Sequence, residues 1–371
     1  MAAPEDEEVM TELSTPLYAT HLAAGAVMTD FAGWQMPLRF SGDRAEHEAV
    51  RTGAGLFDLS HMAQIEVHGP QAAQALDAAL VSEVSRLTPG RARYTMLVTA
   101  DGGILDDLIV YRLTEDEFLV IANAANRETV LDQLTVRSAA HQVGIVDRTT
   151  TRGLIALQGP RAAEVLGTLT DADLTDLRYY ASRSVEVAGI PVLLARTGYT
   201  GEDGFELSSS AVSAADLWQA LLEAGQDAGV IPCGLASRDS LRLEAGMPLY
   251  GNELSSEITP YDLGMNRLVH LDREFVGQEA LAARADQPPR YHLVALHGAG
   301  RRAARAGYPV YLSGEQIGEI TSGILSPTLG HPIALARLDR DLPAETDVTV
   351  DVRGTPTPMT VTSTPFYRRP K

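Results

Sequence analysis

The chain has 371 residues, of which 45% are hydrophobic and 21% charged, with a formal net charge of −19. This length exceeds what one core usually fills, so two or three domains are expected, and no apolar run approaches the ~20 residues of a membrane span. The negative charge argues against a nucleic-acid partner, and the single cysteine, Cys233, excludes internal disulfides and suits the cytoplasm.

Lysine is confined to the last position, Lys371, and every other basic residue is an arginine. No internal lysine is therefore available for a Schiff base or a phosphate-binding loop, which excludes pyridoxal phosphate enzymes and P-loop nucleotidases. The nine histidines are scattered. The chain has no G-x-S-x-G nucleophile motif. It has no H-E-x-x-H motif either, and with scattered histidines no metal site is expected.

A pattern repeats along the first half of the chain, as "IEVHGPQAAQAL" at 65–76 and "IALQGPRAAEVL" at 155–166. Each copy predicts a strand, a Gly-Pro junction and an amphipathic helix that begins near the proline. The offset of 90 residues between 65 and 155 is too long for a solenoid. Two related α+β subdomains are predicted.

A hairpin is predicted from "RARYTMLVTADGGILDDLIVYRL", with strands at 92–99 and 104–112 around the turn "ADGG". Because side chains alternate along a strand, Asp107 shares a face with Ile109 and Tyr111, whereas Asp106 points the other way. A symmetric turn pairs residue 94 with 109 and residue 96 with 107, which adds Tyr94 to the Asp107 face. A carboxylate with two aromatics suits a flat, hydrogen-bonding ring; the alternative is a solvated strand aspartate. Asp106 is expected to support the turn.

Two further polar segments are candidates for the same site. "RTGYTGEDGFEL" at 196–207 predicts a hairpin flanked by Tyr199 and Glu206, and a carboxylate there can accept two hydrogen bonds from an aminopyrimidine. The alternative is an ordinary acidic hairpin. In "CGLASRDSLRLEAGMPLYG" at 233–251, Arg238 and Arg242 stand one helical turn apart. One is expected to face a ligand and the other to form a surface or structural pair.

From about residue 280 the sequence pattern is that of short strands separated by Gly, Pro and Asp turns. This pattern predicts a β-barrel or sandwich. The segment "HGAGRRA" at 297–303 mimics a dinucleotide-binding loop, but "AGYPVYL" follows it and reads as a strand. With no crossover helix to receive a pyrophosphate, we interpret it as a loop between strands.

Long motifs identify a resemblance that runs nearly end to end. They include "TPLYATHLAAGAVMTDFAGWQMPLRF", "GLFDLSHM", "GGILDDLIVY", "LQGPRA", "RTGYTGEDGFE", "CGLASRDSLRLEAGMPLYGNEL", "FVGQEAL" and "GEITSGILSPTLG". In these the chain resembles the T-protein family of the glycine cleavage system, the aminomethyltransferases. The resemblance implies three domains around a central channel: two related α+β subdomains followed by a C-terminal all-β barrel. The expected limits are 1–52 with 150–270, then 53–149 with the hairpin, then 280–371.

The resemblance also implies a reaction and a set of roles. The family transfers an aminomethyl group from the dihydrolipoyl arm of the lipoylated H-protein to tetrahydrofolate, releasing ammonia and 5,10-methylenetetrahydrofolate, without a metal or pyridoxal phosphate. Asp107 matches the family's catalytic aspartate, and Glu206 is the expected reader of the pterin. The positions expected around the folate are Tyr94, Ile109, Tyr111, Asn123, Tyr199, Glu206 and Arg238.

The chain departs from the family at 259–269, where "TPYDLGMNRLV" replaces a pattern like "TPLEAGLGWTV". Asp262 and the Asn266-Arg267 pair stand in place of Glu and Gly-Trp, which puts the carbon donor in question. Alternatives are a tetrahydrofolate-dependent demethylase, a sarcosine oxidase-type folate domain, or a folate-binding protein of iron–sulfur maintenance. The last is disfavoured because "EFVGQEA" lacks that class's lysine and cysteine. An acidic H-protein would need a basic docking patch; candidates are Arg301, Arg302, Arg305 and Arg267.

Overall fold

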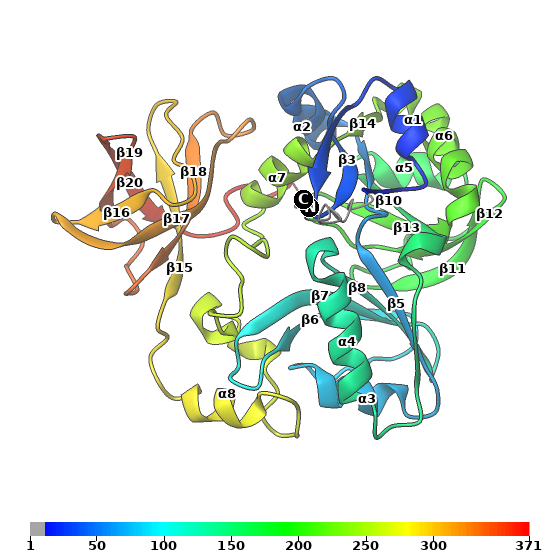
Figure 1. Cartoon of the computed structure of the whole chain (residues 1–371). Helices are drawn as coiled ribbons and strands as arrows, with labels where there is room; N and C mark the ends of the chain where they lie inside the picture. Colours follow the sequence, from blue (N-terminus) through cyan, green and yellow to red (C-terminus); the bar gives the residue numbers. More distant parts are fainter. Residues whose placement is uncertain (1–11, 371) are drawn as a thin grey trace, which may run out of the picture.

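The computed structural model describes residues 12–370, so the first eleven residues and Lys371 lie outside the described part of the expected domains. Within these residues the strands form a three-stranded sheet, a six-stranded sheet, a five-stranded sheet and a closed barrel (Figure 1). The barrel lies to one side and the two larger sheets lie on the other. The mixed α+β architecture and the C-terminal barrel are as predicted.

The six-stranded sheet has the order β11-β12-β13-β10-β4-β14. Its strands in chain order are β4 (Gly55–Asp58), β10 (Arg152–Gln158), β11 (Ser182–Val187), β12 (Ile190–Ala195), β13 (Gly204–Ser210) and β14 (Ile231–Cys233). Helices α5 (Ala162–Gly167) and α6 (Ala214–Ala224) cover one face, where α6 buries Leu217, Trp218 and Leu221 in the core. This core is the apolar stripe of an amphipathic helix set on a sheet.

The N-terminal elements flank the six-stranded sheet. The small sheet has the order β1-β3-β2, with β1 at Leu13–Ser14, β2 at Val27–Phe31 and β3 at Trp34–Arg39. Helix α1 spans Tyr18–Ala23 and α2 spans Asp43–Thr52.

The five-stranded sheet has the order β6-β7-β8-β5-β9. Its strands are β5 (Ala63–His68), β6 (Arg91–Val98), β7 (Ile104–Arg112), β8 (Glu117–Ala122) and β9 (Gly144–Asp147), and its helices are α3 (Ala72–Ala79) and α4 (Arg127–Arg137). Helices α3 and α4 join one core with the strands through Leu76, Val130 and Leu134. β6 and β7 are the predicted hairpin, observed within one residue of the expected limits.

In both larger sheets, the two copies of the sequence repeat form the same strand–helix junction. β5 leads to α3 and β10 leads to α5 through Gly69-Pro70 and Gly159-Pro160. Gly69 has φ +131 and Gly159 has φ +142, in the region that favours glycine. A Cβ would also lie 2.7 Å from the Gln142 carbonyl at Gly69, and 2.4 Å from the Gly53 carbonyl at Gly159.

The two larger sheets share a buried layer. Phe57, Leu154 and Ala156 of the six-stranded sheet pack with Tyr111 and Ile121 of the five-stranded sheet. β4 pairs with β10 and β14, although the expected limit at residue 53 assigns it to the other subdomain. We therefore propose that the boundary follows β4, near residue 60, because strand pairing ties β4 to the six-stranded sheet.

The closed barrel has the order β15-β18-β17-β16-β19-β20. Its strands are β15 (His292–Gly298), β16 (Pro309–Leu312), β17 (Glu315–Leu325), β18 (Pro332–Leu338), β19 (Asp347–Val352) and β20 (Thr355–Thr362). The segment 299–308 is a loop between β15 and β16, which agrees with the interpretation of "HGAGRRA".

Helix α7 (Leu235–Glu244) connects the barrel to the rest of the chain. Arg242 is 1% exposed and pairs with Asp239 at 2.8 Å and with buried Glu253 at 3.1 Å. It also donates to Ser322 Oγ on β17 at 2.8 Å. The segment after α7 continues through short 3₁₀ helices at Pro260–Leu263 and Asn266–Leu268, then α8 (Gln278–Arg284). Within residues 12–370, no helix is both long and apolar enough to cross a membrane.

Candidate active site

The β6–β7 hairpin has the register that the sequence predicts. Tyr94 pairs with Ile109 and Met96 with Asp107. Beyond Leu97 the register shifts, because Leu97 pairs with Asp106 and Val98 with Ile104, leaving Leu105 without a partner. Such a bulge bends the strand at its beginning and changes the direction of nearby side chains.

The carboxylate of Asp107 is partly exposed and is held from two sides. Tyr94 donates its hydroxyl to Oδ2 at 2.9 Å, and Asn123 Nδ2 donates to Oδ1 at 2.8 Å. Asn123 is beside it because β7 pairs with β8 as Ile109 with Ile121, so the next position on the same face after β8 is Asn123. Burial raises the pKa of Asp107, and the hydrogen bonds from Tyr94 and Asn123 oppose that shift.

Asp106 does not support the turn, contrary to the prediction. It is fully buried and accepts from the Asn123 backbone N at 3.0 Å and from Asn126 Nδ2 at 2.6 Å. The turn is held instead by Thr99, whose Oγ1 accepts from the Gly103 backbone N at 3.0 Å. Burial, followed by the charge of Asp107, raises the pKa of Asp106 to about 7.

Glu206 on β13 lies next to the same face of β7. Its Oε2 accepts from Thr197 Oγ1 at 2.5 Å and from the hydroxyl of buried Tyr111 at 3.3 Å. Tyr111 therefore joins the two sheets across their shared layer. The other oxygen, Oε1, accepts no hydrogen bond from residues 12–370, and the side chain is partly exposed. Ile109 is also partly exposed, between Asp107 and Tyr111 on this face.

Arg238 and Tyr199 form the remaining wall. The Arg238 guanidinium carbon lies 4.8 Å from the centre of the Tyr199 ring, and the Tyr199 hydroxyl donates to the Pro248 carbonyl. Within the described chain Arg238 has neither a hydrogen-bonded acceptor nor an ion-pair partner, in contrast to Arg242. Burial lowers the pKa of Arg238, and Tyr199 and Glu206 oppose this. Arg242 therefore forms the structural pair, and Arg238 lies beside Tyr199 with no ion-pair partner in the described chain.

Two tyrosines that the sequence reasoning missed stand near this carboxylate. The charge of Asp107 contributes to raising the pKa of Tyr180 and of Tyr250, in each case after the effect of burial. Tyr180 has φ +59, an uncommon backbone conformation for a bulky residue. Tyr250 belongs to the quoted motif "MPLYGNEL", which was a usable signal, whereas nothing in "DLRYYAS" marks Tyr180.

The divergent segment 259–269 has an internal structural role. Asp262 is buried and closes a capping box with Thr259. Its Oδ1 also accepts from the backbone N of Arg290 at 2.8 Å and of Tyr291 at 3.1 Å, which fixes the chain entering the barrel. Arg267 is exposed in this segment, and Arg301, Arg302 and Arg305 are exposed in the loop before β16.

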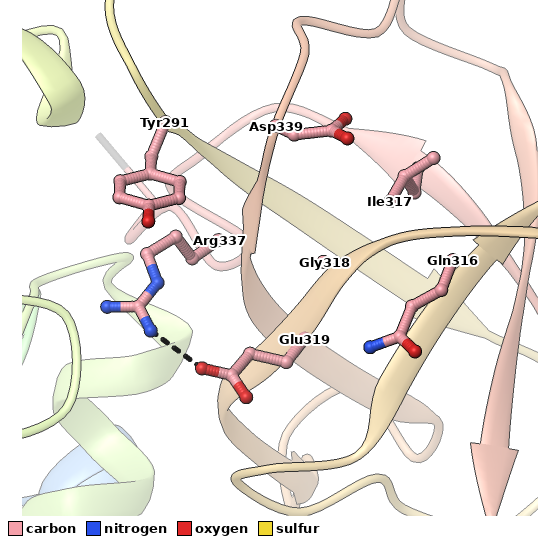
Figure 2. A pocket seen from close by; sticks show the side chains of 7 residues that line it. All are labelled: Tyr291, Gln316, Ile317, Gly318, Glu319, Arg337 and Asp339. Atoms are coloured by element: carbon pink, nitrogen blue, oxygen red, sulfur yellow. Dashed lines mark hydrogen bonds and ion pairs between the residues drawn. The ribbon is translucent and has the colours of Figure 1, made fainter.

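Two hollows lie on the barrel side. One of about 370 Å³ is lined by Tyr291, Gln316, Ile317, Gly318, Glu319, Arg337 and Asp339 (Figure 2). Its Arg337 is already paired with Glu319 at 2.7 Å. The other, of about 390 Å³, is lined by Pro248, Leu263, Met265 and Leu293 among others. Because the Pro248 carbonyl accepts from Tyr199, this second hollow adjoins the site.

Comparisons with known proteins agree along the whole length. The family model described as the GCVT N-terminal domain matches residues 17–273, and that of the glycine cleavage T-protein C-terminal barrel domain matches 292–368. The aminomethyltransferase of Streptomyces coelicolor is 56% identical over 97% of this chain and 99% of its own. That of Shouchella clausii is 44% identical over 97% and 99%. The crystal structure of glycine cleavage system aminomethyltransferase T from Bartonella henselae superposes with a TM-score of 0.90 at 36% identity, covering 97% and 99%.

Proposed function

The chain belongs to the glycine cleavage T-protein family, and we propose that the site around Asp107 performs the transfer. The activity is that of an aminomethyltransferase of the glycine cleavage system. In that reaction the one-carbon unit moves from the S-aminomethyldihydrolipoyl arm of the H-protein to tetrahydrofolate. The products are 5,10-methylenetetrahydrofolate, ammonia and the dihydrolipoyl H-protein.

The side chains around Asp107 suit tetrahydrofolate as the acceptor. Glu206 Oε1 accepts no hydrogen bond from the described residues, and it can receive the donor edge of an aminopyrimidine. The rings of Tyr94 and Tyr199 offer flat apolar surface, and Arg238 brings a cation with no acidic partner within ion-pair distance in the described chain. Bound tetrahydrofolate would supply the amine nitrogens that take up the carbon unit.

The proposal rests on the carboxylate of Asp107, which is partly exposed, is held by Tyr94 and Asn123, and has a raised pKa. Its partial burial strengthens its field relative to water. It therefore stabilises the positive charge that develops on the aminomethyl carbon as the bond to sulfur breaks. Its raised pKa also makes it a better proton acceptor than an ordinary aspartate.

Replacing Glu206 with glutamine is expected to weaken tetrahydrofolate binding by about 1–3 kcal/mol. Thr197 and Tyr111 both donate to Oε2, so they retain the amide oxygen of the new side chain and turn its NH₂ group toward the pterin donors. Calorimetric titration with tetrahydrofolate measures the change. Glu164→Gln, on the exposed side of α5, is the control and should bind as the wild type does. An unchanged affinity in Glu206→Gln would move the pterin site elsewhere.

The docking surface for the H-protein is a further part of the proposal. With a net charge of −19, the chain as a whole repels an acidic carrier, so a local basic cluster must attract it. Arg301, Arg302 and Arg305 are exposed together in the loop before β16. Arg305 is partly engaged, because it donates to the Gly323 carbonyl at 3.0 Å, whereas Arg301 and Arg302 have no hydrogen bond to the described residues.

Reversing the charge of Arg301 and Arg302 to glutamate is expected to raise the KM for the H-protein by ~10-fold, with tetrahydrofolate binding intact. The wild-type KM should rise with salt, and the double variant should show a weaker salt dependence. Arg44 and Arg178 are exposed arginines outside the barrel, so reversing both is the matched control for net charge. Equal KM values for the two double variants at every salt concentration would place docking elsewhere.

A further inference from the structure

The two adjacent aspartates of β7 share one amide. Asn123 Nδ2 lies 2.8 Å from Asp106 Oδ1 and 2.8 Å from Asp107 Oδ1. An amide NH₂ has two hydrogens; the two carboxylate oxygens are the nearer acceptors, and the Asp107 backbone carbonyl lies farther from the same nitrogen, at 3.1 Å. Alternation leaves Asp106 buried and Asp107 partly exposed, and Asn123, one residue past the end of β8, reaches both.

Asp106 holds Asn123 more completely than Asp107 does. Its Oδ2 accepts the Asn123 backbone N at 3.0 Å, at the point where β8 has ended. Its Oδ1 also accepts Asn126 Nδ2 at 2.6 Å, from the 3₁₀ turn that follows. The backbone and side chain of Asn123 are thus both fixed by Asp106, and the side chain is left in a single orientation, toward Asp107.

We propose that Asp106 is a positioning residue for the transfer reaction. It fixes Asn123, and through Asn123 it fixes the Asp107 carboxylate. The inference rests on the proposed function, in which Asp107 acts on the substrates. Asp106 itself is fully buried, so it acts through its neighbours.

The shared amide also brings the two charges together. Two carboxylates bound to one nitrogen cannot both ionise as readily as either alone, so the pair titrates as a unit. The other titratable groups near Asp107 are Tyr94 on β6, Tyr180 before β11, Tyr199 before β13, and Tyr250 after α7. The pKa of each of these tyrosines is raised, so all four are neutral around pH 7. After burial, the charge of Asp107 is the next cause that raises the pKa of Asp106.

The test is the steady-state kinetics of Asp106→Asn at saturating substrates. The plateau kcat should fall by ~10-fold because Asn123 is less firmly held. The KM for tetrahydrofolate should stay within about twofold of the wild-type value, because Asp106 is buried and its side chain contacts neither Glu206 nor Arg238.

Asp147→Asn is the matched structural control. Asp147, on β9 of the same sheet, accepts from the Thr149 backbone N and from Arg127, and it contacts no site residue. This variant should lose stability without lowering kcat. A wild-type kcat in Asp106→Asn would overturn the positioning role, provided that Asp107→Asn is impaired; a fully active Asp107→Asn would instead overturn the proposed function.

Asp107→Asn gives a second measurement that does not depend on the folding of Asp106→Asn. Because the coupling between two charges is mutual, Asp106 should lose its proton at lower pH once the charge of Asp107 is gone. Infrared difference spectroscopy across a pH series, in both proteins, follows the protonated carboxyl directly. An Asp106 titration at the same pH in wild type and Asp107→Asn would contradict the coupling.

Discussion

Asp107→Asn is expected to lower turnover by ~10²-fold or more with little change in stability. The asparagine keeps the shape of the side chain, and its amide oxygen can still accept from Tyr94 or Asn123. It loses the charge that stabilises the aminomethyl carbon and the ability to take up a proton. Steady-state formation of methylenetetrahydrofolate at saturating substrates measures the loss.

Asp101→Asn is the matched control for this variant, because Asp101 is the exposed aspartate in the turn of the same hairpin. It should retain wild-type turnover and the same thermal midpoint. Near-normal turnover in Asp107→Asn would remove the catalytic assignment, whatever its effect on binding.

Arg242→Leu is expected to reduce the free energy of unfolding by about 3–5 kcal/mol. Arg242 is 1% exposed and its partner Glu253 is 0% exposed, so the substitution leaves a buried carboxylate without its counter-charge. It also removes the bond to Ser322 that ties α7 to the barrel. Urea denaturation followed by the fluorescence of buried Trp34 and Trp218 gives the change.

Arg238→Leu is the matched control on the same helix. Arg238 has no hydrogen-bond acceptor or acidic partner within the described chain. The substitution should therefore lower the free energy of unfolding by less than about 1 kcal/mol. Tetrahydrofolate affinity should fall instead. If Arg238→Leu proved the more destabilising and Arg242→Leu bound folate more weakly without unfolding, the roles of the two arginines would be reversed.

The part of the site that could be predicted best is the hairpin, because its strand pairing depends only on residues close together in the sequence. Side-chain alternation and a symmetric turn placed Tyr94 opposite Ile109 and Met96 opposite Asp107, and both pairs are observed. Alternation also placed Asp106 on the face opposite Asp107, as the burial pattern shows. The turn-supporting role expected for Asp106 was wrong, because its carboxylate accepts from Asn123 and Asn126, which follow β8. Nothing in "GGILDDLIVY" announces those partners.

The remaining site residues could not be predicted, because their positions depend on packing between segments far apart in the sequence. Asn126 and Tyr180 reach the site through a 3₁₀ turn after β8 and through a segment that joins β6 by the hydrogen bond from Ala92 N to the Tyr180 carbonyl. Those placements depend on how the two sheets meet, which no local pattern encodes. The expected boundary at residue 53 separates β4 from its partners for the same reason, since β10 and β14 are remote from it in sequence.

The barrel and the two related subdomains could be predicted from the sequence because each rests on a sequence pattern that occurs more than once. The Gly-Pro junctions recur at Gly69 and Gly159 with the same unusual φ. The strand-and-turn texture after residue 280 matches the closed barrel. The arginines of α7 show the intermediate case: their spacing predicted one structural and one ligand-facing side chain, and the family resemblance singled out Arg238 as the ligand-facing one. The buried Glu253 that pairs with Arg242 could not be predicted from the spacing.

The most direct measurement is the conversion of aminomethyl-loaded H-protein by the wild-type enzyme, with and without tetrahydrofolate. With tetrahydrofolate, methylenetetrahydrofolate, ammonia and the dihydrolipoyl H-protein should form in equal amounts, and Asp107→Asn should form them ~10²-fold more slowly. Without tetrahydrofolate no methylenetetrahydrofolate can form, and release of ammonia should be slow. Rapid consumption of the loaded H-protein at one rate whether or not tetrahydrofolate is present would contradict the account, as would no consumption at all.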